Sequence, residues 1–397
     1  MKKILVIKNG LKIGGTTSSF LSLLRSICKN SNYQINAYIY GASKEERENI
    51  PEEIVQVKNE ALDRAFSNPS GIKKFFYLIK NNLFFPYLAY KFFGKKWTRN
   101  KTIKTFQKMD IRKAAAQKQV DLSEYDAVIT WEELYPCYLL AKKIVAKKKI
   151  AWIHPDYENC GFCVKYDLPI FKKLDAVVAV STGGKESLQR CFPHEKDKFF
   201  AVDNCIDIDA IIKKSQEKQT EITKNGFTII TVARLQNISK AMDRAIRIAE
   251  KLKKEGLRFQ WYWIGGGPDQ EETALLIKNA QLTQEFILLG EKDNPYKYVK
   301  QADLFVLQSY YEGRPVVVDE AIALGVPVLV SEYASARIQV KEEYGMVATN
   351  EENDIYLALK TLIENPSSLQ EYRKNLMQAD CSLDGAQQYL ELFNKVI

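Results

Sequence analysis

The chain has 397 residues, of which 46% are hydrophobic and 27% charged, and its formal net charge is +9. This length exceeds one usual domain and fits two, and the hydrophobic fraction supplies enough apolar side chains for two cores. No apolar run reaches the length of a membrane-spanning helix, and an odd number of scattered cysteines argues against a disulfide framework. We therefore expect a two-domain globular protein with reduced thiols, in the cytoplasm.

Strand and helix patterns alternate along the chain, which predicts parallel sheets covered by helices. The first strand is expected at Ile4–Ile7, because the polar residues after it interrupt the apolar run that a signal peptide needs. A helix is expected to begin near Thr16, where apolar residues adopt helical spacing. Gly14 and Gly15 stand at this strand–helix junction, where they either let the backbone approach a ligand or simply form a tight turn.

Residues 72–118 differ in charge from the rest of the chain. They contain 13 lysines and arginines against one acid, Asp110, and this balance of +12 leaves −3 for the remainder. A basic segment rich in aromatic residues is typical of proteins that bind an anionic membrane surface, whereas a pair of core helices with solvated lysines is the alternative. Nucleic-acid binding is not expected, because no module of that kind surrounds the segment. The apolar residues at helical spacing are Ile72, Phe75, Phe76, Ile79 and Leu83.

Two further strands are expected in the first half, at residues 126–131 and 149–153. The second strand ends at His154, one of only two histidines. Ligands of α/β proteins gather at the carboxyl ends of parallel strands, so His154 is a candidate site residue. The structural alternative is a histidine that only packs in the core.

Three other patterns have ordinary explanations. Cys160 and Cys163 form a lone CxxC without a second pair, which predicts two thiols in a loop. Asp207-Ile208-Asp209 has the form of a metal-binding DxD, but we expect it to be coincidental. The polar run of residues 213–225 predicts a linker or a surface loop.

The second half opens with a strand expected at residues 227–232, followed by Arg234 and Lys240. Two cations in a strand–helix loop suit a pyrophosphate leaving group, arginine as a fork and lysine as a point charge. The strand at residues 261–264 ends in the turn Gly265–Pro268, which lacks the later glycine of a dinucleotide-binding fingerprint.

Residues 310–331 are expected to form a loop, then a helix, then a buried strand. Glu312 lies before the helix and Glu320 lies inside it, eight positions later. The helix N-terminus between them has free backbone N–H groups that suit an anion. The alternative is that both acids are solvated residues at a helix end.

These motifs, in this order, resemble those of the retaining glycosyltransferases of family GT4, which have the GT-B fold. Glu312-Gly313-x-Pro315 with Glu320 matches the family's E-x7-E motif, and the triple-glycine turn matches its G-x-G-P turn. Arg234 and Lys240 match the cations of its G-R-L-x(n)-K-G motif, although Ala241 replaces the final glycine.

The resemblance implies roles for individual residues. It implies that Arg234 and Lys240 hold the donor diphosphate and that Glu320 binds the ribose hydroxyls. His154 and Glu312 are implied as the catalytic residues, contacting the sugar, and the donor phosphate would take the acceptor proton. Neither a metal ion nor a cofactor is expected beyond the nucleotide-sugar substrate. The residues implied in donor binding are Gly14, Gly15, Arg234, Lys240, Gly265, Glu291, Asn294, Gly313 and Glu320.

The implied fold is α/β GT-B, with two Rossmann-like domains whose parallel sheets face each other across a cleft. The domains are expected at residues 1–207, which bind the acceptor, and 208–380, which bind the donor, with a helix at 381–397 crossing back. The implied reaction transfers a sugar from a nucleotide-diphosphate sugar, expected to be a UDP-sugar, to a hydroxyl of a lipid-linked or cell-surface glycan intermediate. The alternative is a non-catalytic partner subunit. Residues 72–118 would hold the chain at the inner face of the cell membrane.

Overall fold

The chain folds into two compact units. One unit contains Met1–Cys205 together with Asp384–Ile397, and the other contains Ile206–Leu383. The break lies two residues before the predicted boundary at residue 207, because Ile206 packs in the core of the second unit. The computed structural model describes residues 1–12, 14–27, 32–67, 71–93, 99–204, 206–217, 221–378 and 385–397.

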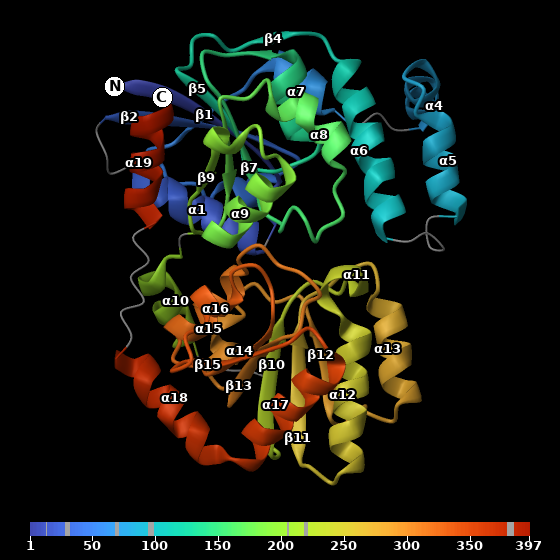
Figure 1. Ribbon diagram of the computed structural model, residues 1–397, viewed down its shortest axis with the longest axis vertical. Coiled ribbons are helices and arrows are strands. Elements are labelled where there is room, and N and C mark those ends of the chain that lie inside the picture. Colours follow the sequence, from blue (N-terminus) through green and yellow to red (C-terminus); the bar gives the residue numbers. More distant parts are fainter. Residues whose placement is uncertain are drawn as a thin grey trace. The chain divides into compact units, whose positions relative to one another are not determined.

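The N-terminal unit is built on a parallel sheet, as the alternating pattern predicts (Figure 1). Its central strands are apolar on both faces and fully buried, because helices cover both sides of the sheet. Two short strands of the same unit, β4 (Val120–Asp121) and β6 (Ile144–Val145), form a separate parallel pair. The strands of the main sheet, in spatial order, are β3 (Val55–Gln56), β2 (Tyr33–Tyr40), β1 (Lys2–Asn9), β5 (Ala127–Thr130), β7 (Lys149–Ile153), β8 (Ala176–Ala179) and β9 (Phe199–Ala201).

Two hydrophobic clusters fill the two sides of this sheet. On one side α1 and the C-terminal helix α19 supply the apolar side chains, and on the other side α3 and α6 to α9 do so. Tyr389 and Phe393 of α19 are fully buried, and Tyr33 donates a hydrogen bond to Asn394 at 2.6 Å. The chain's last helix is therefore part of the first unit's core. The helices of this unit are α1 (Gly15–Ile27), α2 (Lys44–Arg47), α3 (Glu60–Phe66), α4 (Gly71–Lys80), α5 (Phe84–Phe93), α6 (Arg99–Ala115), α7 (Tyr135–Lys143), α8 (Val164–Phe171), α9 (Thr182–Cys191) and α19 (Gly385–Val396).

The C-terminal unit repeats the design with a second parallel sheet. Helices α12 and α17 pack on one face, while α10, α15 and α16 contribute to the cluster on the other. In spatial order its strands are β12 (Phe286–Gly290), β11 (Phe259–Ile264), β10 (Phe227–Val232), β13 (Leu304–Leu307), β14 (Val328–Ser331) and β15 (Gly345–Ala348). Its helices are α10 (Ile208–Ser215), α11 (Asn237–Lys240), α12 (Met242–Lys254), α13 (Gln270–Asn279), α14 (Tyr296–Val299), α15 (Val316–Ala323), α16 (Ala336–Gln339), α17 (Glu352–Glu364) and α18 (Pro366–Gln378).

Helix α10 corrects the predicted linker of residues 213–225. The helix ends at Ser215, so the first residues of that run are helical rather than extended or looped. Asp207 is the N-cap of α10, and its carboxylate accepts a hydrogen bond from the Ala210 backbone N–H at 3.1 Å. The first acid of the DxD pattern therefore has a structural role as a helix cap.

Helix α15 begins and ends where its sequence predicts. Pro315 immediately precedes the first helical residue, and Gly325 follows the last turn with φ +71°. The Val326 N–H donates to the Ala321 carbonyl at 3.0 Å and the Gly325 N–H to the Ile322 carbonyl at 2.9 Å, which is the Schellman pattern. The glycine is needed there because its left-handed conformation costs other residues energy.

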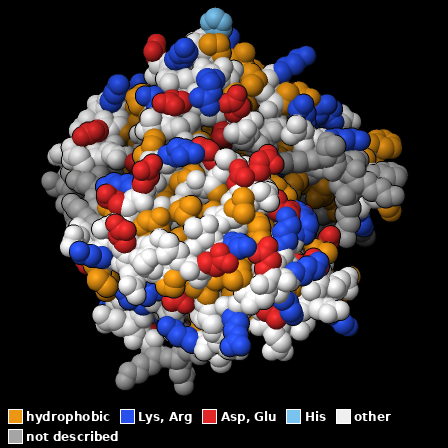
Figure 2. Space-filling model, turned by 60° about the horizontal axis from the view of Figure 1, so that its bottom comes forward, with side chains coloured by type: hydrophobic (Ala, Val, Ile, Leu, Met, Phe, Trp, Pro, Cys, Tyr) orange, Lys and Arg blue, Asp and Glu red, His pale blue; other side chains and the backbone are white. Residues whose placement is uncertain are grey.

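The surface and the helix lengths agree with the composition. Within the described ranges, no helix is both long enough and apolar enough to cross a bilayer. On the face drawn in Figure 2, Lys and Arg side chains lie among Asp and Glu side chains, without a patch of one sign. This mixture agrees with the small net charge of the chain outside residues 72–118.

Candidate active site

The carboxyl ends of the strands in the C-terminal unit bring the predicted donor-site residues to one edge of its sheet. Because β10, β11, β12 and β13 are parallel, the loops that follow them all emerge at the same edge. These four loops contain Arg234, Gly265, Glu291 and Glu312. The edge of the sheet is thus the candidate active site of this unit.

The loop after β10 is fixed by the glycine turn after β11. The Leu235 N–H donates to the Gly266 carbonyl at 2.9 Å, and the Trp263 indole donates to the Ala233 carbonyl at 2.8 Å. A Cβ atom on Gly265 would lie 2.2 Å from the Ala233 carbonyl oxygen, which is sterically impossible. The glycines are therefore required by the close approach of two backbones, and this contact holds Arg234 on a rigid loop.

Arg234 itself is exposed and available to a ligand. Its guanidinium makes no hydrogen bond or ion pair with any residue in the described ranges. An unpaired arginine on a rigid loop can accept a phosphate group as a bidentate fork without first losing a partner in the protein.

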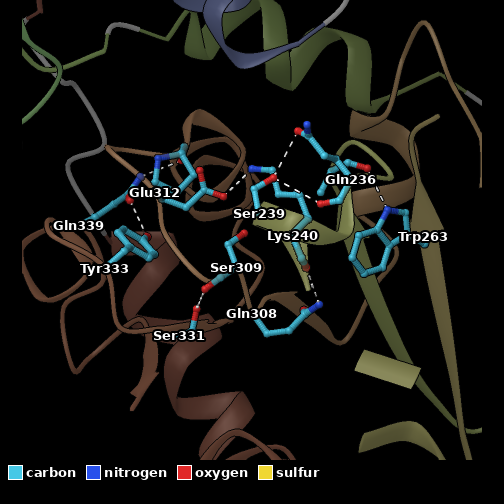
Figure 3. A network of polar contacts seen from close by, with 12 residues as sticks. Gln236, Ser239, Lys240, Trp263, Gln308, Ser309, Glu312, Ser331, Tyr333 and Gln339 are labelled. Atoms are coloured by element: carbon cyan, nitrogen blue, oxygen red, sulfur yellow. Dashed lines mark hydrogen bonds and ion pairs between the residues drawn. The ribbon is translucent and has the colours of Figure 1, made fainter. Parts of the chain in front are cut away.

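Lys240 and Glu312 form an ion pair, although 72 residues separate them. The Lys240 Nζ atom lies 2.5 Å from Glu312 Oε1, and the two side chains are 21% and 13% exposed. Figure 3 shows the two side chains pointing toward each other from α11 and from the loop before α15. The pairing brings the predicted phosphate-binding cation next to the predicted sugar-binding acid.

The residue after Lys240 has a backbone conformation that favours glycine. Ala241 is fully buried and adopts the left-handed conformation, with φ +52° and ψ +45°. Gln308 supports this turn, since its side-chain amide donates to the Lys240 carbonyl at 3.2 Å. The alanine therefore keeps the backbone geometry that glycine adopts more easily, at a conformational cost.

The loop that holds Glu312 is fixed by buried polar contacts. The Ser335 hydroxyl donates to the Gly313 carbonyl at 2.7 Å, and the Gln339 amide donates to the Pro315 carbonyl at 3.0 Å. Arg314 and Asp319 form a buried ion pair with N–O distances of 3.2 and 3.3 Å. The sequence gives little sign of this pair, because arginine at a helix start is usually solvated.

Glu320 is buried in α15, which excludes the interpretation that it is a solvated residue at a helix end. Its Oε1 atom accepts a hydrogen bond from the Tyr296 hydroxyl at 3.0 Å. Tyr296 is the first residue of α14, directly after the loop that follows β12 and contains Glu291 and Asn294, two residues implied in donor binding. The contact joins the two predicted nucleoside-binding elements.

Asn294 and Glu291, the two residues of the loop after β12 that are predicted to bind the donor, differ in how accessible they are to a ligand. The Asn294 side chain is engaged in the fold, since it donates to the Lys214 carbonyl at 2.9 Å and accepts from the Tyr296 N–H at 3.1 Å. Glu291 is exposed and lies against Gly266, where a Cβ atom would meet its carboxylate at 2.7 Å. Asn294 thus shapes the loop, and Glu291 is left accessible.

In the N-terminal unit, His154 lies after β7 and is held by backbone contacts. Its Nε2 atom lies 2.6 Å from the Trp131 carbonyl oxygen, which can only accept, so Nε2 carries the proton and Nδ1 is the acceptor. Burial lowers the pKa of His154 to about 4, so the ring is neutral near pH 7. A neutral imidazole with Nδ1 unprotonated suits a hydrogen bond from a sugar hydroxyl.

Gly14 directly precedes α1, which begins at Gly15, and the Gly14 carbonyl accepts from the Thr17 and Ser18 N–H groups. Gly14 does not adopt a left-handed conformation, and a Cβ atom there would meet nothing within 4 Å. The fold therefore does not require glycine at residue 14, which weakens the tight-turn interpretation and leaves close approach of a ligand as the alternative.

The described ranges contain no group of three or more His, Cys, Asp or Glu side chains arranged to hold a metal ion. Cys160 is buried and its thiol donates to the Tyr157 carbonyl at 3.3 Å, while Cys163 precedes α8.

The basic segment contains two different environments. The predicted apolar face of α4 is exposed, with Phe75 at 45%, Phe76 at 64% and Ile79 at 48%, so the core interpretation is wrong for these residues. On α5, Phe85 and Phe92 are 80% and 70% exposed. Of the other two residues of the predicted apolar face, Leu83 is buried, and the side chain of Ile72 is not among those that the structure describes.

Helix α6, in contrast, is anchored in the core. The Gln107 amide donates to Asp167 at 2.8 Å, and Asp167 also accepts from the hydroxyls of Tyr138 and Tyr157 at 2.7 Å. The outer face of α6 presents Lys101, Lys104 and Lys108, which line a surface pocket with Tyr166. This helix thus joins a buried polar network to a row of exposed lysines.

Known proteins that are similar to this chain are described as glycosyltransferases. Residues 212–379 match the family model described as glycosyl transferases group 1. A Campylobacter jejuni protein named N-acetylgalactosamine-N,N'-diacetylbacillosaminyl-diphospho-undecaprenol 4-alpha-N-acetylgalactosaminyltransferase is 28% identical over 207 residues, 51% of this chain and 55% of that relative. The putative colanic acid biosynthesis glycosyltransferase WcaL of Escherichia coli is 36% identical over 25% of this chain and 27% of its own. The chain thus spans about half the length of these curated relatives or less.

Solved structures show the fold. Anabaena HepE in complex with UDP has a TM-score of 0.68 and 15% identity, with 100% of both chains covered. A mutant of Staphylococcus aureus TarM, in complex with UDP and other ligands, has a TM-score of 0.67 and 14% identity, covering 99% of this chain and 100% of that one. At these identities the likeness establishes the GT-B fold and nothing further, and it confirms the predicted fold class.

Proposed function

We propose that this chain is a retaining glycosyltransferase of the glycosyl transferases group 1 family, whose model matches residues 212–379. It transfers a sugar from a nucleotide-diphosphate sugar to a hydroxyl of a lipid-linked or cell-surface glycan intermediate. The bond from the sugar's anomeric carbon to the diphosphate breaks, the bond to the acceptor oxygen forms, and the donor phosphate takes the acceptor proton.

One observation carries this proposal: the connection after β10 contains Arg234, which no described residue pairs with, and Lys240, which is paired with Glu312. As the sugar leaves, negative charge builds on the diphosphate and the ring becomes oxocarbenium-like. Arg234 and Lys240 stabilise the diphosphate, and Glu312, a carboxylate beside the lysine, favours the positive ring. Fixed charges of both signs at one edge suit this separation of charge.

The remaining roles follow from hydrogen-bonding capacity. Glu320, already bonded to Tyr296, accepts the ribose hydroxyls, and the loop after β12 receives the base. His154 accepts a hydrogen bond from the sugar through Nδ1, because its Nε2–H is committed to the Trp131 carbonyl.

We infer that the donor carries UDP. HepE and TarM were solved with UDP, and the TarM complex also contains alpha-GlcNAc-glycerol. The name of the Campylobacter relative includes a diphospho-undecaprenol acceptor, which supports a lipid-linked intermediate here.

The test of donor binding is thermal unfolding of the full chain with UDP-, GDP-, ADP- and CMP-sugars. A ligand that binds only the folded state raises the melting temperature. We expect UDP-sugars to raise it and Arg234→Ala to abolish the rise, with a fall in kcat/KM of about 100-fold. Arg258→Ala removes an exposed arginine at the start of β11 and serves as the matched control. A rise that is the same in both variants would refute the assignment of Arg234.

Catalysis is tested separately by the release of UDP from UDP-sugars with and without a glycan acceptor. Donor binding without any turnover would favour the non-catalytic partner subunit over an enzyme.

We further propose that the exposed aromatic residues of α4 and α5, with the lysines of α6, bind an anionic bilayer. Apolar side chains beside cations match the composition of its surface. The double variant Phe85→Ser/Phe92→Ser should lose most sedimentation with phosphatidylglycerol vesicles at low salt. Ile338→Ser/Met377→Ser, which changes two exposed apolar residues in the other unit, should sediment as wild type. Equal sedimentation of the two double variants would overturn the proposal.

A further inference from the structure

The N-terminal unit contains a cavity of about 610 Å³ at the carboxyl ends of its strands. This volume is within the range of small-molecule sites. The register of the sheet explains the position, because Asn9 pairs with Tyr40 at the ends of β1 and β2, and β5 ends beside them. The cavity is lined only by residues of the N-terminal unit.

One wall of the cavity is aromatic. Tyr40 stacks on Phe66 with ring centroids 4.0 Å apart, and Tyr135 packs edge-on against Phe66 at 5.7 Å. The Tyr40 hydroxyl has no hydrogen-bond partner within the described part of the chain. A flat aromatic surface with a hydroxyl at its rim suits the apolar face of a sugar ring and one of its hydroxyl groups.

The other wall is acidic. Asp63, Asp110, Glu132 and Glu133 line the cavity. Glu132 is paired with the buried Lys8 at 2.8 Å, and Asp63 accepts from Tyr38 at 2.8 Å.

Asp110, in contrast, receives no hydrogen bond or ion pair from the described residues. Burial raises its pKa to about 6, partly opposed by Lys113. Asp110 therefore lines the cavity as a carboxyl group that no described residue engages in a hydrogen bond, with the charge of Lys113 near it.

Glu133 connects this cavity to His154. Its carboxylate accepts a hydrogen bond from the His154 backbone N–H at 3.3 Å, so one residue both lines the cavity and positions the histidine loop. An occupant of the cavity would therefore lie one residue from the side chain that we propose to contact the transferred sugar. This proximity favours the acceptor, rather than an unrelated ligand, as the occupant.

We propose that this cavity binds the acceptor's terminal sugar, and that it selects a neutral or amino sugar over one bearing a carboxylate or a phosphate. The inference rests on the proposed function and adds the chemical class of its acceptor. Hydroxyl and ammonium groups donate hydrogen bonds to carboxylates, whereas an anionic sugar would face an excess of acids in a partly desolvated site. With Glu132 paired to Lys8, the lining still holds Asp63, Asp110 and Glu133 against two cations, Arg47 and Lys113.

The test uses saturation-transfer NMR and competition on the full chain with methyl glucoside, methyl galactosaminide and methyl glucuronide as probes. We expect the first two to bind and the glucuronide not to bind. Asp110→Asn should weaken the galactosaminide by about tenfold, and Tyr40→Phe should weaken both bound probes by a few-fold. Asp197→Asn, an exposed acid outside the cavity, should leave binding unchanged.

Two outcomes would overturn the inference: binding of the glucuronide as tight as that of the glucoside, or unchanged binding in both cavity variants. Near-ultraviolet circular dichroism confirms that these variants are folded. The rise in melting temperature with UDP-sugars is measured on the wild-type chain in parallel. Absence of that rise counts against the proposed function, whereas its presence without probe selectivity counts against the cavity alone.

Discussion

The two units present the same kind of edge, the carboxyl ends of a parallel sheet, with opposite electrostatic designs. In the C-terminal unit the charges are accessible or paired with each other, as for Arg234 and for Lys240 with Glu312. In the N-terminal unit the charges are desolvated, and burial raises the pKa of Glu133 to about 7 and lowers that of His154 to about 4. An accessible cation suits a diphosphate, whereas a desolvated site of acids and a neutral imidazole suits uncharged hydroxyl groups.

The largest expected effect is the loss of stability when the buried Arg314–Asp319 ion pair of the C-terminal unit is broken. Asp319→Asn leaves the Arg314 guanidinium buried without its counter-charge, and should lower the free energy of unfolding of the C-terminal unit by about 3–5 kcal/mol. Urea unfolding monitored by tryptophan fluorescence measures the change. Arg337→Ala breaks an exposed ion pair with Glu332 nearby and should give no resolvable change. Equal effects of the two variants would show that the buried pair does not hold this edge.

The second prediction addresses the desolvated edge of the N-terminal unit. His154 has a lower pKa when folded than when unfolded, so the unfolded state binds more protons between pH 4 and 6.5. The free energy of unfolding of wild type relative to His154→Gln should therefore fall by up to about 3 kcal/mol as the pH drops from 6.5 to 4.

Glu133→Gln gives the opposite sign and is the control for that experiment. The raised pKa of Glu133 means that the folded state binds more protons between pH 4.5 and 7. Wild type should therefore lose stability relative to Glu133→Gln as the pH rises through that range. Parallel pH profiles for wild type and both variants would mean that neither group is desolvated.

A smaller effect is expected for the ion pair at the donor edge. A double-mutant cycle of Lys240→Met and Glu312→Gln should give a coupling energy of about 1 kcal/mol in the free chain, decreasing with salt. If Lys240 moves to the donor diphosphate, saturating UDP should reduce this coupling. A coupling energy that saturating UDP leaves unchanged would show that the Lys240–Glu312 pair takes no part in donor binding.

The smallest effect concerns Ala241. Ala241→Gly removes the strain of a left-handed alanine but increases unfolded-state entropy and removes a buried methyl group, so stability should change by less than about 1 kcal/mol. Ala245→Gly, at a fully buried position inside α12, has no strain to relieve and should be destabilising by about 1–2 kcal/mol. A loss as large at residue 241 as at residue 245 would show that the left-handed turn costs nothing.

Much of the fold was predictable, because its signals are local. The strands and the ends of α15 follow from apolar runs, a proline and a glycine, which act through the backbone of their own neighbourhood. The candidate donor residues follow from the order of motifs in the family resemblance, and their individual roles stay predictions until tested.

Other features depend on which helix packs against which strand. The periodicity of α4 predicts an apolar face but does not show whether another element covers it. Three residues of that face, Phe75, Phe76 and Ile79, are exposed. In the same way, the sequence cannot show that Lys240 meets Glu312 or that Tyr296 meets Glu320.

By itself, the sequence determined the alternation of strands and helices, the parallel sheets and the glycine turn, since apolar periodicity and backbone freedom are properties of adjacent residues. Only the tertiary structure decided the pKa shifts of His154 and Glu133, the burial of the Asp110 carboxyl and the cavity that it lines. The physical reason is that desolvation and ion pairing depend on distances between residues far apart in the chain, which are fixed only when the sheets and helices pack.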